Sequence, residues 1–257
     1  MQVDGNYIKL PKLGKVKIFK DSFVHGTPKT ATIIREHDGY YICITARRTA
    51  SNIEQYSFRL ASESPGGEPQ AVGLDMGIAR FATFSTGEHI ANPKHFVKYE
   101  RKLRIANRAL ARKKKYSANW YKQKQKLSKL HAKISRVRKD FLHQQSWQII
   151  KNNGLIAVED LKVKSMVRSR LARHISDAGW STFKSQLEYK SGWHGRIFMK
   201  VDPKYTSQIC SGCGHKDKEN RQTQSKFVCL SCGEEHNADV NAAASAVRKE
   251  YFSQGIG

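Results

Sequence analysis

The sequence predicts an α/β protein that carries a small zinc-binding unit and a long, strongly basic helical hairpin. Three observations support this fold class. Short apolar runs with strand character recur in residues 1–90, at 154–161 and at 195–203. Apolar residues repeat at helical spacing within 94–152. Four of the five cysteines form two CxxC pairs between positions 210 and 232. A chain of 257 residues can bury a core in one large domain or two small ones.

The charge balance predicts a polyanionic partner. Lysine and arginine number 46 against 22 acids, which gives a formal net charge of +24. An excess of this size favours nucleic acid, although a merely soluble basic protein or a histone-like packing protein would share it. No apolar stretch approaches the roughly 20 residues of a membrane span, and the start has no signal-peptide core. We therefore expect a cytoplasmic, nucleoid-associated protein with reduced thiols.

The first 90 residues are predicted to be mainly β-structure. "KVKIF", "TATIIRE" and "YYICITAR" are expected strands, and Cys43 in the last of them is expected to be a buried, unreactive thiol. Residues 61–70, "ASESPGGEPQ", have the composition of a linker. Two further strands are expected in 71–90, joined by a hairpin turn at "STGE".

Residues 94–152 are predicted to form an antiparallel helical hairpin. An apolar stripe with spacings of three and four residues marks the second helix. "YSAN" at 116–119 is the expected break, where Ser117 or Asn119 can cap the second helix. The stripe consists of Leu127, Leu130, Ile134, Val137 and Phe141.

The hairpin concentrates most of the positive charge. Positions 98–139 hold 17 lysines and arginines and one acid, a net +16 in 42 residues. Because ordinary solvated helix faces mix charges of both signs, we expect phosphate contacts here. Trp120 and Tyr121 could stack on bases or pack in a core, whereas Trp180 and Trp193 are expected to be core residues. The predicted nucleic-acid-binding residues are Arg112, Lys113, Lys114, Lys115, Lys122 and Lys126.

The cysteine block predicts a structural zinc site. Cys210, Cys213, Cys229 and Cys232 follow the pattern C-x2-C-x15-C-x2-C, which lies within the spacing range of zinc ribbons. Four thiolates close the site, so the metal would be structural, and two paired CxxC units argue against a redox dithiol. His215 and His236 are expected on the ribbon surface. The alternative for His236 is that it contacts one of the metal ligands rather than the metal itself.

Three acids stand in unexpected places for so basic a chain. Asp75 lies in an apolar run, Glu159 ends the strand "GLIAVE", and Asp239 opens an alanine-rich helix, where capping is its alternative role. Carboxylates that converge repel one another, and a bound divalent cation relieves the repulsion. In a protein that holds phosphodiesters, this combination suggests two-metal hydrolysis.

Four stretches together closely resemble the TnpB/OrfB proteins of insertion sequences, relatives of type V CRISPR effectors: "GLDMGIARFAT", "GLIAVEDLKVKSM", "DAGWSTFKSQLEYKSGWHGRIFMKVDPKYTSQICSGCG" and "CLSCGEEHNADVNAA". The resemblance implies an RNA-guided DNA endonuclease with a RuvC-like, RNase H-type nuclease fold. It implies that Asp75, Glu159 and Asp239 are the catalytic acids, holding two Mg²⁺ ions, and that the zinc ribbon precedes the last acid. Implied partners are a transposon-derived guide RNA and target DNA.

The chain departs from the family pattern in two respects. Asn237 and Ala238 replace the Asp and Arg usual before the last aspartate. The chain also resembles the family only from a point after its helical recognition domain, so we expect it to lack the N-terminal part. The expected domains are a partial wedge-like β-barrel segment (1–62), the RuvC-like core with the basic hairpin (71–204), the zinc ribbon (205–236) and a final RuvC segment with the C-terminal helix (237–257).

Three functions follow from this pattern. The first is a compact or truncated RNA-guided nuclease, in which case the acids are catalytic. The second is a non-cleaving accessory protein that binds guide RNA or DNA and assists a full-length copy or a second chain. The third is a structure-selective nuclease without a guide. The acids favour an enzyme, whereas the missing front favours an accessory role.

Overall fold

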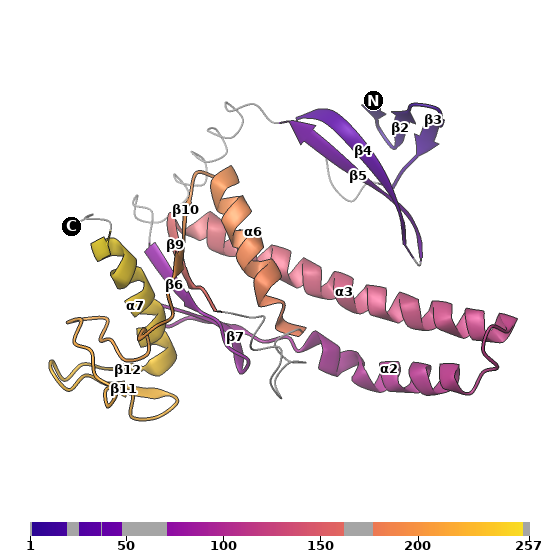
Figure 1. Ribbon diagram of the computed structural model, residues 1–257. Coiled ribbons are helices and arrows are strands. Elements are labelled where there is room, and N and C mark those ends of the chain that lie inside the picture. The colour runs from indigo at the N-terminus through magenta and orange to yellow at the C-terminus, as the bar shows by residue number, and fades with distance from the viewer. Residues whose placement is uncertain (1, 20–25, 37, 48–70, 162–176, 254–257) are drawn as a thin grey trace. The chain divides into compact units, whose positions relative to one another are not determined.

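The computed structural model describes residues 2–19, 26–36, 38–47, 71–161 and 177–253 (Figure 1). The expected linker at 61–70 and residues 162–176 lie outside the described residues. The chain divides into two compact units, one comprising Met1–Ser57 and Leu103–Lys133, the other Phe58–Lys102 and Ile134–Gly257. Within the described ranges, none of the helices combines the length and apolar character that crossing a membrane requires.

A five-stranded mixed sheet is the centre of the second unit. Its strands are β6 (Ala71–Asp75), β7 (Arg80–Phe84), β8 (His89–Ala91), β9 (Leu155–Glu159) and β10 (Ile197–Val201). They lie in the order β10-β9-β6-β7-β8. β6, β9 and β10 run parallel, whereas β7 and β8 continue as antiparallel neighbours. The expected hairpin turn at 85–88 is confirmed, and Gly87 there adopts a φ of 92°.

One face of this sheet packs against two helices, α3 (Ala118–Asn152) and α6 (Trp180–Trp193). The strands supply every second residue to this core, as the alternation of side chains in a strand requires. The rings of Phe81 and Phe183 meet edge to face at 4.9 Å. The buried cluster joins Val72, Leu74, Ile156 and Val158 of the sheet to Leu142, Ile149, Ile150, Trp180, Phe183 and Leu187 of the helices.

The opposite face is covered by α7 (Ala238–Ser253), whose small side chains allow a close approach. Ala246 packs in one buried cluster with Ala157 of β9 and Val201 of β10. At Gly73 of β6, a Cβ atom would overlap the backbone carbonyl of Ala243. Since backbone cannot move aside as a side chain can, only glycine fits at this point of contact.

The basic hairpin is formed by α2 (His95–Ala111) and the first part of α3, as predicted. Ser117 caps α3, because its hydroxyl accepts a hydrogen bond from the Trp120 N–H at 3.2 Å. At the other end of the hairpin, the buried Asp177 carboxylate accepts two hydrogen bonds from the Phe96 N–H, at 2.9 and 3.0 Å. The start of α2 is therefore held by a carboxylate distant in sequence.

The two tryptophans expected in the core differ. Trp180 is buried, as predicted, but Trp193 is 60% exposed, so that expectation was wrong. Trp193 is the last residue of α6, beyond the last buried turn of the helix, and its ring contacts Tyr189 at 4.6 Å. Helical spacing alone does not tell where the covering partner of a helix ends.

A small cysteine-rich unit precedes α7. Its strands β11 (Lys226–Val228) and β12 (Glu235–Asn237) pair antiparallel. Cys210, Phe227, Cys229 and Ala238 form its buried cluster. Because Ala238 is also the first residue of α7, this unit continues directly into the helix that covers the sheet.

The described N-terminal strands form two separate sheets. One contains β1 (Gln2–Asp4), β2 (Tyr7–Leu10) and β3 (Gly14–Lys17), and the other β4 (Thr27–Glu36) and β5 (Gly39–Arg47). Cys43 of β5 is exposed, so the expectation of a buried thiol was wrong. Among the described strands β5 pairs only with β4, and every residue of β5 is exposed or only half-buried.

Candidate active site and metal centre

Two of the three acids end neighbouring parallel strands. Asp75 is the last residue of β6 and Glu159 the last of β9, each directly after the paired residues Leu74 and Val158. Side chains alternate along a strand, so Asp75 shares the face of Gly73, and Glu159 shares the face of Ala157. Both of these neighbours contact α7. The pairing and the alternation together direct both carboxylates toward α7.

Asp239 lies in the first turn of α7. The alternative role of Asp239 as the helix cap is not met, because Asn237 caps the helix: its Oδ1 accepts a hydrogen bond from the Asp239 N–H at 3.0 Å. The carboxylate of Asp239 is therefore available for another role. It lies 3.7 Å from a guanidinium nitrogen of Arg221, with its side chain 39% exposed.

The electrostatics of Asp75 show that Glu159 and Asp239 both lie near enough to act on its carboxyl, and we refer to these three residues as the acid cluster. Burial, followed by the charges of Glu159 and of Asp239, raises the pKa of the Asp75 carboxyl to about 7. Glu159 is itself 6% exposed. A protein of net charge +24 thus holds mutually repelling carboxylates at the edge of its central sheet. Hard oxygen ligands of this kind suit a divalent cation such as Mg²⁺, which removes the repulsion.

Arg221 is a site residue that the sequence reasoning missed. Besides its pairing with Asp239, it lowers the pKa of the Asp75 carboxyl against the effect of the other groups. It extends from the loop between the two cysteine pairs. Buried Asn220 anchors that loop, donating to the Gln208 carbonyl at 2.9 Å and accepting from the Leu230 N–H at 3.0 Å. Nothing in the local sequence distinguishes Arg221 from the other cations of this loop.

Lys184 of α6 is a second residue that the sequence reasoning missed. Its ammonium lies 2.8 Å from the Asp160 carboxylate and donates to the Leu161 carbonyl at 3.3 Å. The Asp160 N–H in turn donates to the Val201 carbonyl at 2.8 Å. These contacts hold the backbone that directly follows Glu159. Lys184 is buried, so the segment is tied to the core of the sheet.

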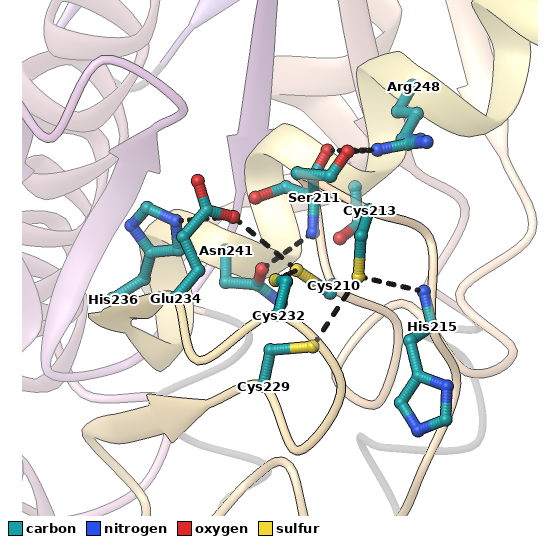
Figure 2. Close-up of polar contacts among 12 residues, drawn as sticks. Cys210, Ser211, Cys213, His215, Cys229, Cys232, Glu234, His236, Asn241 and Arg248 are labelled. Carbon is teal, nitrogen blue, oxygen red and sulfur yellow. Dashed lines mark hydrogen bonds and ion pairs between the residues drawn. The ribbon is translucent and has the colours of Figure 1, made fainter.

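The four cysteines come together as a possible metal centre. Their sulfur atoms all lie within 4.8 Å of one another, with 3.7 Å between Cys210 and Cys232 and 3.5 Å between Cys213 and Cys229 (Figure 2). A tetrahedral zinc site with Zn–S bonds of about 2.3 Å requires sulfur–sulfur distances of about 3.8 Å. The four thiols therefore fit one ion such as zinc. Among the described residues, no other group of three or more such ligands is as compact.

The four thiols differ in their tendency to ionise. Burial would raise the pKa of the Cys229 thiol, but backbone N–H groups of Cys232 and Ser231, together with the neighbouring cysteine side chains, lower it to about 6. Burial raises the pKa of the Cys210 thiol, so in the metal-free chain Cys229 is the readier of these two to ionise. A thiolate is the form that binds zinc. His215 is exposed, as expected, while His236 is half-buried and lies 3.5 Å from the Glu234 carboxylate. Neither histidine belongs to the compact group of ligands.

The cysteine unit is bonded to the helix that carries Asp239. Asn241 accepts from the Ser211 N–H at 3.0 Å and donates to the Ile209 carbonyl at 2.8 Å. Ser245 donates to the same carbonyl at 2.8 Å. Figure 2 shows Arg248, which donates to the carbonyl of Ser211 at 2.8 Å. Three successive turns of α7 thus hold the loop of the first cysteine pair (residues 209–213). The order of that loop and the position of α7 therefore depend on each other.

The predicted nucleic-acid-binding residues lie at the turn of the hairpin and on the first turns of α3. All six are exposed, and none of the described acids lies between positions 101 and 139. They belong to the other compact unit. Four of them, residues 112–115, occupy the turn itself, and Lys122 and Lys126 follow one helical turn apart.

Comparison with known proteins gives two family matches. The family model of IS605 OrfB, described as "Probable transposase", matches residues 56–170, and the "Cas12f1-like, TNB domain" model matches 180–245. A candidate RNA-guided DNA endonuclease of Escherichia coli (strain K12), InsQ, is 39% identical over 93% of this chain and 61% of its own length. A candidate RNA-guided DNA endonuclease of Streptomyces pristinaespiralis is 41% identical over 67% of this chain and 43% of its own. A TnpB-like protein of Methanocaldococcus jannaschii is 30% identical over 56% of this chain and 53% of its own. The chain thus spans between about two fifths and three fifths of these relatives.

Proposed function

Because this chain belongs to the TnpB/OrfB family of insertion-sequence proteins, we propose that it acts in RNA-guided cleavage of DNA and hydrolyses the phosphodiester bond at the acid cluster. The convergence of Asp75, Glu159 and Asp239 carries the proposal. Burial and the neighbouring carboxylates raise the pKa of Asp75 to about 7. Such a shift is typical of functional sites, and here a bound cation would relieve the repulsion that contributes to it. The relatives' names supply the RNA guide and the DNA substrate, which are carried over to this chain by similarity.

The three carboxylates are the proposed ligands of Mg²⁺, in the two-ion arrangement that the family resemblance implies. Divalent cations at such a site supply an activated water and stabilise the charge on the leaving oxygen. Glu159 is buried, and the contact of Lys184 with Asp160 holds the backbone that follows it. Asp75 must lose its proton to bind a cation, and because the pKa of its carboxyl is about 7 in the metal-free chain, cation binding should weaken as the pH falls below 7.

Arg221 is the proposed contact for the scissile phosphate. In the metal-free chain its guanidinium lies 3.7 Å from the Asp239 carboxylate, and both side chains are about one third exposed. A cation bound by Asp239 would compete with this pairing and leave the guanidinium beside the site. Guanidinium groups recognise phosphate oxygens through two parallel N–H donors. This role would make the cysteine unit contribute directly to the active site.

The finer fold assignment is also part of the proposal. A sheet in the order β10-β9-β6-β7-β8, with acids at the ends of β6 and β9, supports a RuvC-like nuclease core of the RNase H type. With it we propose the division into a partial barrel segment (1–62), the nuclease core (71–204), a zinc ribbon (205–236) and a final RuvC segment (237–257). Zinc in the ribbon would be structural, because four thiolates leave no open position.

Cleavage by an Asp75→Ala variant tests the proposal. The protein is purified with its bound RNA, and Mg²⁺-dependent cleavage of matching single-stranded and duplex DNA is followed on gels. The variant is expected to lose cleavage because one carboxylate ligand is missing. It should keep nucleic-acid binding, because the lysines and arginines supply that attraction.

Glu88→Ala is the matched control. Glu88 is an exposed acid in the β7–β8 turn of the same sheet, outside the cluster. It should cut as the unaltered chain does. If Asp75→Ala also cuts as well as the unaltered chain, the metal-site assignment of the acids is wrong. If the unaltered chain cuts neither substrate, the alternative of a non-cleaving accessory protein gains its first support.

A further inference from the structure

Three aromatic side chains gather at the turn of the basic hairpin without entering a core. The Trp120 ring lies 5.6 Å from the Tyr116 ring and 5.1 Å from the Tyr121 ring, centroid to centroid. Tyr116 is 66% exposed and Tyr121 is 54% exposed. Trp120 is half-buried between them. The packing stripe of α3 begins only after these residues, so the tyrosines contribute little to the fold.

Tyr116 is presented to solvent by an unusual backbone conformation. Tyr116 has a φ of 67°, in the left-handed region that aromatic residues rarely adopt. The Ser117 N–H donates to the Lys114 carbonyl at 3.1 Å, and the Ser117 hydroxyl caps α3. The aromatic group is therefore mounted on an ordered turn between two helices.

Cations lie over these rings. The ammonium of Lys115 is 5.1 Å from the centre of the Tyr116 ring, and that of Lys124 is 5.0 Å from the centre of the Trp120 ring. Since positions 101–139 contain no acid, nothing in this segment neutralises these charges. Exposed rings interleaved with cations can take up both parts of a nucleotide strand, because the base stacks and the phosphate pairs with lysine.

We propose that Tyr116, Trp120 and Tyr121 form a stacking site for unpaired nucleobases, with the lysines of the turn binding the flanking phosphates. A duplex hides its base faces within its own stack, so the site should favour single strands over duplexes. An acidic peptide would satisfy the lysines but would leave the rings without a partner. The proposal rests on the proposed function only in taking nucleic acid as the polyanion, and it does not depend on cleavage.

Binding of labelled oligonucleotides to a Tyr116→Asn/Tyr121→Leu variant tests the site. Asparagine tolerates the left-handed conformation at 116, and leucine suits the exposed helical position at 121. Fluorescence anisotropy compares single-stranded RNA, single-stranded DNA and duplex DNA over a series of salt concentrations. The variant should bind single strands about tenfold more weakly and duplex unchanged. Its salt dependence should equal that of the unaltered chain, because no phosphate contact is removed.

Two controls separate stacking from other effects. Tyr40 is 73% exposed in the same compact unit, with Arg35 over its ring at 6.0 Å, and none of the described aromatic pairs includes it. Tyr40→Leu should leave binding unchanged. Tyr116→Phe/Tyr121→Phe keeps the rings and should bind as the unaltered chain does. Equal thermal unfolding of all variants verifies that the hairpin is folded.

The outcomes distinguish the sources of the ligand. A loss confined to RNA assigns the site to the RNA partner, a loss confined to DNA assigns it to an opened DNA strand, and a loss in both supports a site that reads only the bases. Equal losses on duplex and single strands, or a loss no greater than that of Tyr40→Leu, would overturn the proposal. Because this experiment measures binding and not cleavage, its failure would not bear on the proposed role of the acid cluster, which the Asp75→Ala experiment tests separately.

Discussion

Replacement of Asp75 by asparagine should stabilise the metal-free protein. The pKa of this carboxyl rises from 3.8 to about 7, first because of burial and then because of Glu159 and Asp239. A rise of about three units at 1.36 kcal/mol per unit sets a ceiling of about 4 kcal/mol for the cost of the charged form. We expect about half of it, roughly 2 kcal/mol, because water relaxes around a half-buried group. For a unit of this size that corresponds to an increase in the unfolding temperature of about 4–8 °C.

The dependence on pH gives the sign of the effect. Between pH 3.8 and about 7 the folded protein binds more protons at Asp75 than the unfolded chain does. This contribution to stability is therefore fully present below pH 3.8 and is lost as the pH rises through about 7. Asp75→Asn should remove this decline, so the two proteins should differ least near pH 4, by about a third of the full effect near pH 5, and most above about pH 7. Added Mg²⁺ should raise the unfolding temperature of the unaltered chain, and this effect should grow as the pH rises toward 7 and remain large above it. It should not raise the unfolding temperature of the variant.

Thermal unfolding by circular dichroism at several pH values measures these differences. The proteins are dialysed into magnesium-free buffer without chelator, because a chelator would also remove zinc from the cysteines. Glu88→Gln, an exposed acid in the β7–β8 turn, is the matched control and should leave the unfolding temperature unchanged. An Asp75→Asn variant that unfolds at or below the temperature of the unaltered chain at pH 8 would refute the crowding of the carboxylates.

Three further variants test other parts of the structure. Cys229→Ser should reduce metal content from about one zinc per chain to almost none and expose residues 205–236 to protease, whereas full zinc occupancy would contradict the four-thiol site. Alanine at residues 113–115 should weaken binding to all sequences alike and make the slope of log affinity against log salt shallower by about 2–3; an unchanged slope would mean that these lysines do not contact phosphate. Gly73→Ala should cost about 3 kcal/mol in a denaturant titration, because its Cβ overlaps the Ala243 carbonyl, and a loss below about 1 kcal/mol would argue against this close approach.

Features made by residues close together in the chain could be predicted from the sequence. The spacing of the cysteine pairs indicated the compact thiol group, which the structure brings within 4.8 Å. Apolar spacing predicted the helical hairpin, and Ser117 was one of two expected caps. The apolar runs predicted that Asp75 and Glu159 would lie in or at the end of strands, which they do. The catalytic roles of the acids remain predictions.

Other features depended on which surfaces meet. The exposure of Trp193 and Cys43 contradicts expectation, because helical spacing and strand propensity do not reveal where a covering layer ends. Asn237 rather than Asp239 caps α7, a choice between neighbouring residues that depends on backbone geometry. Arg221 could not be singled out, because its loop contains several cations and only the fold brings one of them to Asp239.

By itself, the sequence indicated the strands of the central sheet, the helical hairpin, the compact group of four thiols and the positive charge of the hairpin, because these follow from local spacing and composition. Only the tertiary structure decided that Asp75 and Glu159 face the helix that carries Asp239. That convergence requires the parallel pairing of β6 with β9 and the close packing of α7 on Gly73. Both are contacts between segments far apart in the chain, and such contacts depend on the burial of whole faces rather than on any local pattern.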